Sequence, residues 1–192
     1  MDHIGILQWN CQGVRGKKDE LLELVNNFRP AIVALQETKL WTSYKFEIIE
    51  FNMERKDGHF NRTLLGGVGL LIHSDTPYEV ISLATNFQAI AIRINIGQLI
   101  TICNVYISGT QNFNITCDLI YQLPSPYILL CDFNSHNTNW GCRNTVSRGM
   151  ILERIVTDKN VCILNNGAPT CIGYYSVHNC YYHLRSYINS YN

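Results

Sequence analysis

Two apolar segments flank one amphipathic helix at the start of the chain, and this order limits the folds that the sequence can adopt. Residues 4–10 have the composition of a strand, residues 17–28 repeat apolar residues at helical spacing, and residues 31–35 are again apolar. The helix should end before Pro30, because the residue preceding a proline avoids helical backbone angles. A strand, a helix and a strand within about forty residues predict a right-handed crossover between two parallel strands.

This arrangement places two polar side chains together. Asn10 ends the first segment and Glu37 follows the second. The carboxyl ends of parallel strands meet at one edge of a sheet, and open α/β sheets bind their ligands at that edge. We therefore expect Asn10 and Glu37 to lie close together at a ligand-binding edge.

A third apolar run, from Tyr127 to Cys131, stops abruptly at Asp132, and Asn134 and His136 follow at alternate positions. The run is short enough to be a buried strand. A carboxylate, an amide and an imidazole then leave the end of a rigid strand together, where chemistry is common. A polar turn that only caps the strand is the alternative for this segment taken alone.

Further strands and helices complete a predicted α/β domain. Isoleucines that alternate with other residues predict a half-buried strand over residues 90–96. Gly97-Gln98 predicts a hairpin to a strand over residues 99–106, which ends in Tyr106. The remaining predicted elements are strands over residues 46–51, 66–72 and 161–164 and helices over residues 115–122 and 148–159, the last with Ile151, Leu152, Ile155 and Val156 facing inward.

These strand ends carry the groups that one divalent metal ion and a phosphodiester need. Glu37 is the candidate metal ligand, since a hard cation such as Mg²⁺ takes carboxylate oxygens and keeps several waters. Asp132 could orient and deprotonate the attacking water. Tyr106 could donate a hydrogen bond to a phosphoryl oxygen as charge builds there. Asn10 and Asn134 can form hydrogen bonds without adding charge beside an anion.

Each residue also has a simpler interpretation when it is considered alone. Glu37 could be a solvated strand end, Tyr106 a core aromatic, and the two asparagines ordinary turn residues. Their shared placement at strand ends favours a site.

Composition limits the partners and the location. The 192 residues, 46% of them apolar, suit one domain with a sizeable core. Lys plus Arg and Asp plus Glu both number 15, so a nucleic acid contact must use a local patch. Arg15, Lys17, Lys18 and Arg143 are the candidates for that patch.

No apolar run in the sequence is long enough to span a bilayer, so we expect no membrane contact. The first residues lack the charged and apolar regions of a signal peptide. We therefore expect an intracellular protein, nuclear or cytoplasmic, whose eight cysteines are reduced thiols.

Four short motifs at the strand ends resemble the endonuclease/exonuclease/phosphatase superfamily. They are Gln8-Trp9-Asn10, Leu35-Gln36-Glu37-Thr38, Asn104-Val105-Tyr106 and Cys131-Asp132-Phe133-Asn134. More closely, the chain resembles the apurinic-type endonuclease domain of non-LTR retrotransposons. The segments that carry this closer resemblance are Asn137 to Gly141 and Ile163 to Thr170.

The resemblance implies a fold, an activity and partners. The family fold is a DNase-like, four-layer α/β sandwich in which two packed mixed β-sheets are flanked by helices. The implied activity is that of a hydrolase, dependent on Mg²⁺ or Mn²⁺, that nicks one strand of target DNA for retrotransposon insertion. The nick leaves a 3′-hydroxyl that primes reverse transcription, so the implied partners are DNA and the reverse transcriptase domain of the parent polyprotein.

The resemblance assigns the same roles to the individual residues. Glu37 matches the metal-binding Glu, and Asn10 matches the Asn beside the metal, with a part in catalysis. Tyr106 matches the Tyr that contacts the phosphate. Asp132 and Asn134 match the water-activating Asp and its neighbour.

Two more residues are expected to contact the substrate. His136 stands where relatives often have His, and Arg143 is a candidate for binding DNA.

The C-terminal region departs from the family pattern. Relatives continue after the Tyr-Ser region with an Asp-containing strand and a Ser-Asp-His motif, whose His contacts the scissile phosphate. In this chain Tyr175-Ser176 is followed by Val177-His178-Asn179-Cys180, and no Asp or Glu comes after Asp158. We therefore expect a domain over residues 1–176 whose last strands are missing, a divergent tail over residues 177–192, and weak or absent activity. An ordinary Tyr-rich edge is the alternative interpretation of the tail.

Two other functions stay open at this point. One is a catalytically dead remnant that keeps only metal or nucleic acid binding. The other is a phosphoesterase that acts on a lipid or a nucleotide, against which the retrotransposon-like Trp140-Gly141 pair argues.

Overall fold

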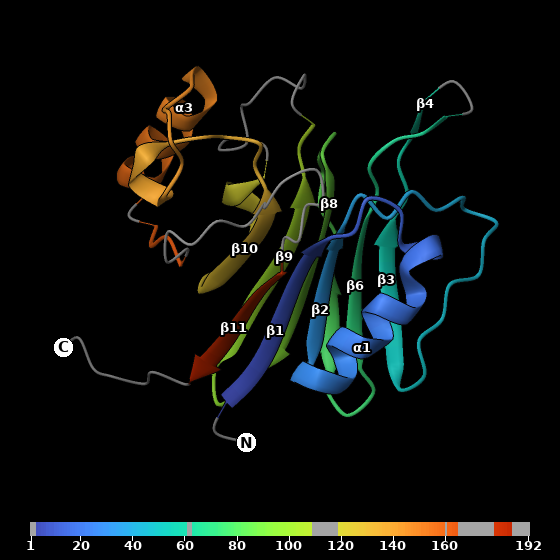
Figure 1. The fold of residues 1–192 in the computed structure, drawn as a ribbon. Helices are drawn as coiled ribbons and strands as arrows, with labels where there is room; N and C mark the ends of the chain where they lie inside the picture. Colours follow the sequence, from blue (N-terminus) through green and yellow to red (C-terminus); the bar gives the residue numbers. More distant parts are fainter. Residues whose placement is uncertain (1–2, 61–62, 109–118, 160, 165–178, 186–192) are drawn as a thin grey trace.

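The computed structural model describes residues 3–60, 63–108, 119–159, 161–164 and 179–185. Two sheets form the centre of the molecule (Figure 1). The first sheet has the order β11-β1-β2-β6-β3, and the second has the order β10-β9-β8-β7. The first sheet contains β1 (His3–Asn10), β2 (Ile32–Gln36), β3 (Phe51–Lys56), β6 (Val68–His73) and β11 (Asn179–Arg185), and the second contains β7 (Tyr78–Ile81), β8 (Gln88–Asn95), β9 (Leu99–Tyr106) and β10 (Tyr127–Asp132).

Helices and loops cover the outer faces of the two sheets. The helices are α1 (Lys18–Phe28) and α3 (Ser147–Asp158), and the short 3-10 turns are η1 (Val14–Lys17), η2 (Ile120–Gln122) and η3 (Thr138–Trp140). A small ribbon of β4 (His59–Phe60) and β5 (Thr63–Leu64) extends beyond the sheets (Figure 1). Among the described residues, no helix has both the length and the apolar character that crossing a membrane requires.

Alternation along each strand produces three apolar cores. On β1, Ile6 faces the second sheet and Leu7 faces α1. Ile92 and Ile102 meet Ile6 in the central core between the sheets. The outer core of the first sheet is closed by α1, and that of the second sheet includes Leu152 of α3. The result is the four-layer α/β sandwich that the sequence predicted.

Two parallel pairs bring four strand ends to one edge. Strand β1 runs parallel to β2 with Asn10 opposite Gln36, which is the residue before Glu37. Strand β10 runs parallel to β9 with Asp132 opposite Tyr106. The predicted crossover from residues 4–10 to residues 31–35 is therefore present. The candidate residues lie at the ends of neighbouring strands, at matching positions in the sheet.

A buried amide joins the two sheets just beneath this edge. Asn104 of β9 is fully buried, and its Nδ2 donates to the backbone oxygens of Leu35 at 2.9 Å and Gly69 at 2.8 Å, both in the first sheet. Its Oδ1 accepts a 2.6 Å hydrogen bond from Nε2 of Gln36, which is also fully buried. Because buried polar groups are costly when they lack partners, this network fixes how the sheets align.

Several predicted boundaries differ from the structure. The strand placed over residues 46–51 lies instead at Phe51–Lys56, since Phe46 and Ile48 serve as buried anchors of a loop across the first sheet. Residues 161–164 form no strand. Much of the helix predicted over residues 115–122 lies outside the described residues, and the described part contains η2.

Two burial predictions were wrong, one for α3 and one for β8. Both depend on which residues lie in the contact between the second sheet and the layer that covers its outer face. Ile151 was expected to face inward, but its side chain is 43% exposed, whereas Leu152 packs against the second sheet. The strand over residues 90–96 was expected to be half-buried, but Ala91 is fully buried as well because the outer core covers it.

The tail also requires a correction. Strand β11 pairs antiparallel with β1, so that part of residues 177–192 closes the first sheet. The expectation of missing last strands is therefore wrong for that sheet, and β1 is an interior strand. Within the described residues, β10 and β7 are the two edge strands of the second sheet.

Replacing Asn104 with leucine tests the joint between the sheets. The change leaves the backbone oxygens of Leu35 and Gly69 without these donors, so the free energy of unfolding should fall by about 2–4 kcal/mol. Urea denaturation measures it. Asn52→Leu, at the exposed position of β3, is the control and should change stability by less than about 0.5 kcal/mol. Equal effects of the two changes would contradict a stabilising role for Asn104.

Candidate active site

One asparagine connects the two candidate carboxylates. Asn10 is almost fully buried, and its Nδ2 donates to Oε1 of Glu37 at 3.0 Å and to Oδ2 of Asp132 at 2.7 Å. Glu37 follows a strand of the first sheet and Asp132 ends a strand of the second. The hydrogen bonds of a single amide group therefore span both sheets and hold two carboxylates together.

The backbone at Glu37 has an unusual conformation that its neighbours hold in place. Glu37 has a φ of 52°, in the left-handed region that side chains other than glycine rarely adopt. Its carbonyl accepts a 2.8 Å hydrogen bond from the amide of Gly13, and the next amide, of Thr38, donates to Gly67 at 3.1 Å. Such a conformation costs about 1–3 kcal/mol of folding free energy, and it persists only where the surrounding hydrogen bonds hold the backbone in place.

Asn134 has a similar conformation and a positioning role. Its φ is 47°, and its backbone amide donates to Oδ1 of Asp132 at 3.1 Å. Its side-chain Nδ2 donates to the backbone oxygen of Ile107 at 3.1 Å. The Asp132 carboxylate is thus held on one oxygen by Asn10 and on the other by Asn134.

Tyr106 completes the cluster, and its phenol stays protonated at neutral pH. Burial raises the pKa of Tyr106 to about 12, and the negative charges of Glu37 and Asp132 add to the effect, as does a hydrogen bond to Glu37. A phenol with this pKa is a hydrogen-bond donor throughout the physiological range.

The Tyr106 ring lies in a cradle that depends on a glycine. Gly66 has a φ of +70°, and a Cβ built there would come within 2.7 Å of the ring. Gln88, opposite Tyr106 in the sheet, donates from Nε2 to the Leu65 oxygen and accepts at Oε1 from the Gly67 amide. Together with the bond from the Leu65 amide to the Gly58 oxygen, these contacts close the base of the β4–β5 ribbon.

The donor set fits a hard divalent cation. Oδ1 of Asn10 is buried and has no hydrogen-bond partner, and it belongs to the same amide that contacts Glu37. No three His, Cys, Asp or Glu residues of the described part of the chain are grouped closely enough to enclose a metal ion. A cation here would therefore take one or two protein oxygens and keep several waters, which is how Mg²⁺ is commonly bound.

Two predicted substrate residues are not in this cluster. His136 and Arg143 are exposed, and within the described residues neither side chain makes a hydrogen bond or ion pair with Asn10, Glu37, Tyr106 or Asp132. They lie in the loop that follows β10 and leads to α3.

Sequence reasoning missed the residue that anchors this loop. Glu153 of α3 accepts hydrogen bonds from Nδ2 of Asn137 at 2.9 Å and Nδ2 of Asn139 at 2.6 Å. A Cβ added at Gly149 would lie 2.0 Å from the backbone oxygen of His136, so the loop sits directly on the helix. The two asparagines and a helical Glu were visible in the sequence, but their pairing depends on how the loop turns back.

The basic residues predicted to contact DNA extend from the same edge along η1 and α1. Arg15 lies over the ring of Tyr44 at 4.9 Å, and Lys17 lies 5.9 Å from the ring of Trp9. Lys18 lies 5.9 Å from the ring of Phe46. These three cations therefore rest on aromatic faces beside the edge at which β1 ends.

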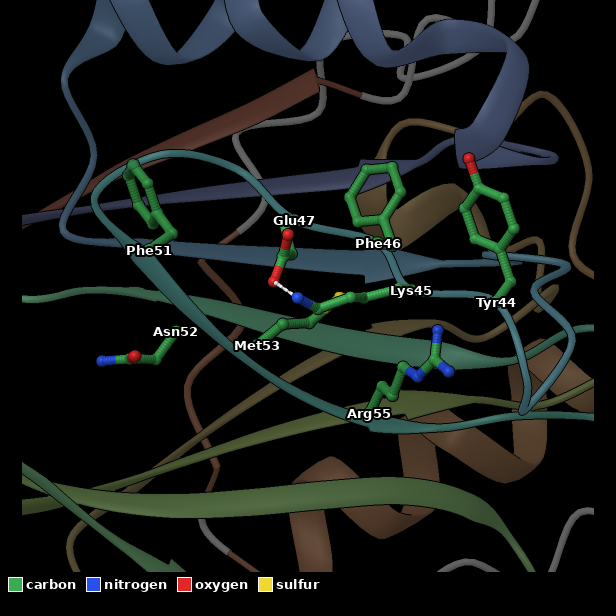
Figure 2. A pocket seen from close by; sticks show the side chains of 8 residues that line it. All are labelled: Tyr44, Lys45, Phe46, Glu47, Phe51, Asn52, Met53 and Arg55. Carbon is green, nitrogen blue, oxygen red and sulfur yellow. Dashed lines mark ion pairs between the residues drawn. The ribbon is translucent and has the colours of Figure 1, made fainter.

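Tyr44 and Phe46 also line an open pocket between β3 and the loop before it (Figure 2). Its other lining residues are Lys45, Glu47, Phe51, Asn52, Met53 and Arg55. None of them belongs to the cluster of Asn10, Glu37, Tyr106 and Asp132, so the pocket is separate from the candidate active site.

Comparisons with known proteins agree with this fold. A family model described as "Endonuclease-reverse transcriptase" matches residues 100–180. The endonuclease domain of TRAS1, a telomere-specific non-LTR retrotransposon, superimposes with a TM-score of 0.73 and 18% identity, over 93% of this chain and 83% of that one. The chain has the fold of the endonuclease/exonuclease/phosphatase superfamily. The resemblance predicted from the four strand-end motifs is thereby confirmed.

Two further solved structures share this superfamily fold with lower TM-scores. The AP endonuclease LMAP from Leishmania major has a TM-score of 0.56 and 13% identity, over 78% of this chain and 61% of that chain. The Xenopus laevis APE2 catalytic domain has a TM-score of 0.54 and 18% identity, over 80% of this chain and 67% of that chain. Among curated proteins, none matches the sequence.

Replacing Gly66 with alanine should displace Tyr106 without removing it. The added methyl group requires an unfavourable positive φ and meets the ring, so the phenol should move and its pKa should fall toward that of an exposed tyrosine. Spectroscopic pH titration of the variant, with Tyr106→Phe to identify the signal, measures the change. Gly16→Ala, where the added Cβ has open space, is the control. An unchanged Tyr106 titration would show that the cradle is not needed.

Proposed function

We propose that the protein is a divalent-metal-dependent phosphodiesterase that nicks one strand of DNA. The observation that carries the proposal is the convergence of Asn10, Glu37, Tyr106 and Asp132 at one edge of the sandwich. The similarity in fold to the TRAS1 endonuclease domain and to two AP endonucleases supports DNA as the substrate.

Glu37 and Oδ1 of Asn10 would hold the cation. When bound, Mg²⁺ or Mn²⁺ supplies positive charge that stabilises the negative charge developing on the phosphodiester. Asn10 Nδ2 meanwhile keeps the Glu37 carboxylate in place, since its hydrogen bond is independent of the oxygen that remains unpartnered.

Asp132 acts on the attacking water. Its carboxylate accepts from Asn10 on one oxygen and from the Asn134 amide on the other, so it cannot rotate freely. A fixed carboxylate can orient a water molecule and accept its proton as the oxygen attacks phosphorus. Asn134 serves this step as a positioning residue.

Tyr106 donates a hydrogen bond to a phosphoryl oxygen. Because its pKa is raised to about 12, the phenol keeps its proton at any pH at which DNA is cleaved under physiological conditions. A donor aimed at developing charge in a partly buried site is typically worth about 10²–10³ in rate.

DNA would be held by a few cations beside the edge. Arg15, Lys17 and Lys18 extend from it on η1 and α1, and Arg143 projects from the loop after β10. The nick would prime reverse transcription by a reverse transcriptase domain of the parent polyprotein, and the protein would act inside the cell, in the nucleus or the cytoplasm.

A catalytically dead remnant is the second candidate, and the tail favours it. No Asp or Glu follows Asp158, so the chain has no Ser-Asp-His motif near its end. A lipid or nucleotide phosphoesterase has less support, since Trp140-Gly141 and Asn165 to Thr170 resemble the retrotransposon group.

Nicking of supercoiled plasmid with Mg²⁺ tests the proposal. Glu37→Gln should weaken Mg²⁺ binding measured by calorimetry, because it removes the charge that a hard cation needs. Asp132→Asn should lower the nicking rate by about 10²–10⁴ while Mg²⁺ still binds. Glu79→Gln on exposed β7 is the control and should change neither property. Undiminished nicking in both site variants would remove these carboxylates from the mechanism.

The tail should limit the rate. We expect nicking to be at least about a hundredfold slower than that of a relative with the complete motif, since one donor to the developing charge is lost. Grafting such a relative's segment after Ser176 should restore the rate. His183 is not a substitute, because it pairs with Gly5, roughly 16 Å along β1 from Asn10. Full activity of the unmodified chain would show that another group replaces the missing His, with His178 the first to mutate.

A further inference from the structure

A lysine that the mechanism does not use contacts the candidate metal ligand. Nζ of Lys39 lies 3.1 Å from Oε2 of Glu37, while Oε1 of the same carboxylate accepts from Asn10. The Lys39 side chain is 36% exposed and the Glu37 side chain only 17%. The ammonium therefore neutralises the carboxylate oxygen that Asn10 does not contact.

The backbone holds Lys39 in this position. Its amide donates to the Gly66 oxygen at 2.9 Å, and the preceding Thr38, fully buried, donates to the Gly67 oxygen at 3.1 Å. Lys39 has a φ of 48°, so Glu37 and Lys39 both adopt left-handed backbone conformations around one buried residue. The ion pair is a product of the segment's backbone path, unlike an incidental pair between two flexible surface side chains.

A positive group fits the charge of the cluster. Glu37 and Asp132 share one amide donor, Nδ2 of Asn10, so two carboxylates are held near each other. Like charges at short range in a partly buried site repel strongly, and a nearby cation relieves the repulsion. A divalent ion at Glu37 would supply that relief, and it would also be repelled by the ammonium.

We infer that Lys39 is an internal counterion that competes with the divalent metal for Glu37 and thereby lowers the metal affinity of the site. This inference rests on the proposed metal-dependent function. In the metal-free protein Lys39 balances the Glu37 charge. When a divalent cation binds, the ammonium leaves Oε2, and its flexible four-carbon stem lets it move toward solvent or toward the phosphate of bound DNA.

Calorimetric titration of Mn²⁺ into the full chain at constant ionic strength tests the inference. Lys39→Met should bind Mn²⁺ about three- to tenfold more tightly than the unmodified protein, a size in keeping with a partly exposed ion pair. Lys39→Arg keeps the charge and should stay near the unmodified affinity. Lys45→Met is the matched control, because Lys45 forms an exposed 2.7 Å pair with Glu47 away from the cluster (Figure 2). It loses the same charge and should leave the affinity unchanged.

A thermal readout supports the titration without any catalytic assay. Since a ligand that binds the folded state more tightly stabilises it more at the same concentration, a given Mn²⁺ concentration should raise the Tm of Lys39→Met by more than that of the unmodified protein. Lys39→Gln provides the same test with a polar side chain if the methionine variant aggregates.

The outcomes separate this inference from the proposed function. Equal or weaker Mn²⁺ binding by Lys39→Met and Lys39→Gln, with metal binding and plasmid nicking intact in the unmodified chain, overturns the inference alone. Tighter binding by Lys45→Met to the same extent also overturns it, because the effect would then come from net charge. Failure of every variant and of the unmodified chain to bind Mn²⁺ overturns both the inference and the metal-dependent function.

Discussion

The hydrogen bonds from a single side-chain nitrogen hold the candidate active site together. Nδ2 of Asn10 contacts Glu37 and Asp132, which come from different sheets, so the site exists only while the sheets keep their alignment. Asn104 secures that alignment from beneath by joining Gln36 and two backbone oxygens of the first sheet. The polar interior of this sandwich is thus concentrated where two sheets must be kept in register.

The backbone around the candidate site also adopts unusual conformations. Glu37, Lys39 and Asn134 all adopt positive φ values, which are unfavourable for Glu and Lys and better tolerated by Asn. Glu37 is held by its hydrogen bond with Gly13, Lys39 by its bond with Gly66, and Thr38 between them by its bond with Gly67. Strain of this kind is typical of functional sites, and here it accompanies the contact of the Glu37 carboxylate with Asn10.

Much of this arrangement could be predicted from the sequence, because short apolar runs that end in polar residues are local signals. Asn10, Glu37, Tyr106 and Asp132 stand directly at such ends, and the parallel pairing of β1 with β2 follows from the strand-helix-strand order. Contacts that depend on loop paths could not be predicted in this way. The pairing of Lys39 with Glu37 requires two left-handed residues, and Glu153 reaches Asn137 only because the loop folds back onto α3. Strand β11 was missed because its pairing with β1 joins opposite ends of the chain.

The hydrogen bonds that close the base of the β4–β5 ribbon separate the ribbon from the position of Tyr106. Gln88 ties Leu65 and Gly67 to the second sheet, and the Leu65 amide bonds the Gly58 oxygen, so both legs of the ribbon are fastened next to Tyr106. Any length of chain inserted beyond these bonds leaves the phenol where it is. The ribbon can therefore be lengthened, shortened or exchanged as a module, and the surface beside Tyr106 can change while the phenol keeps its place.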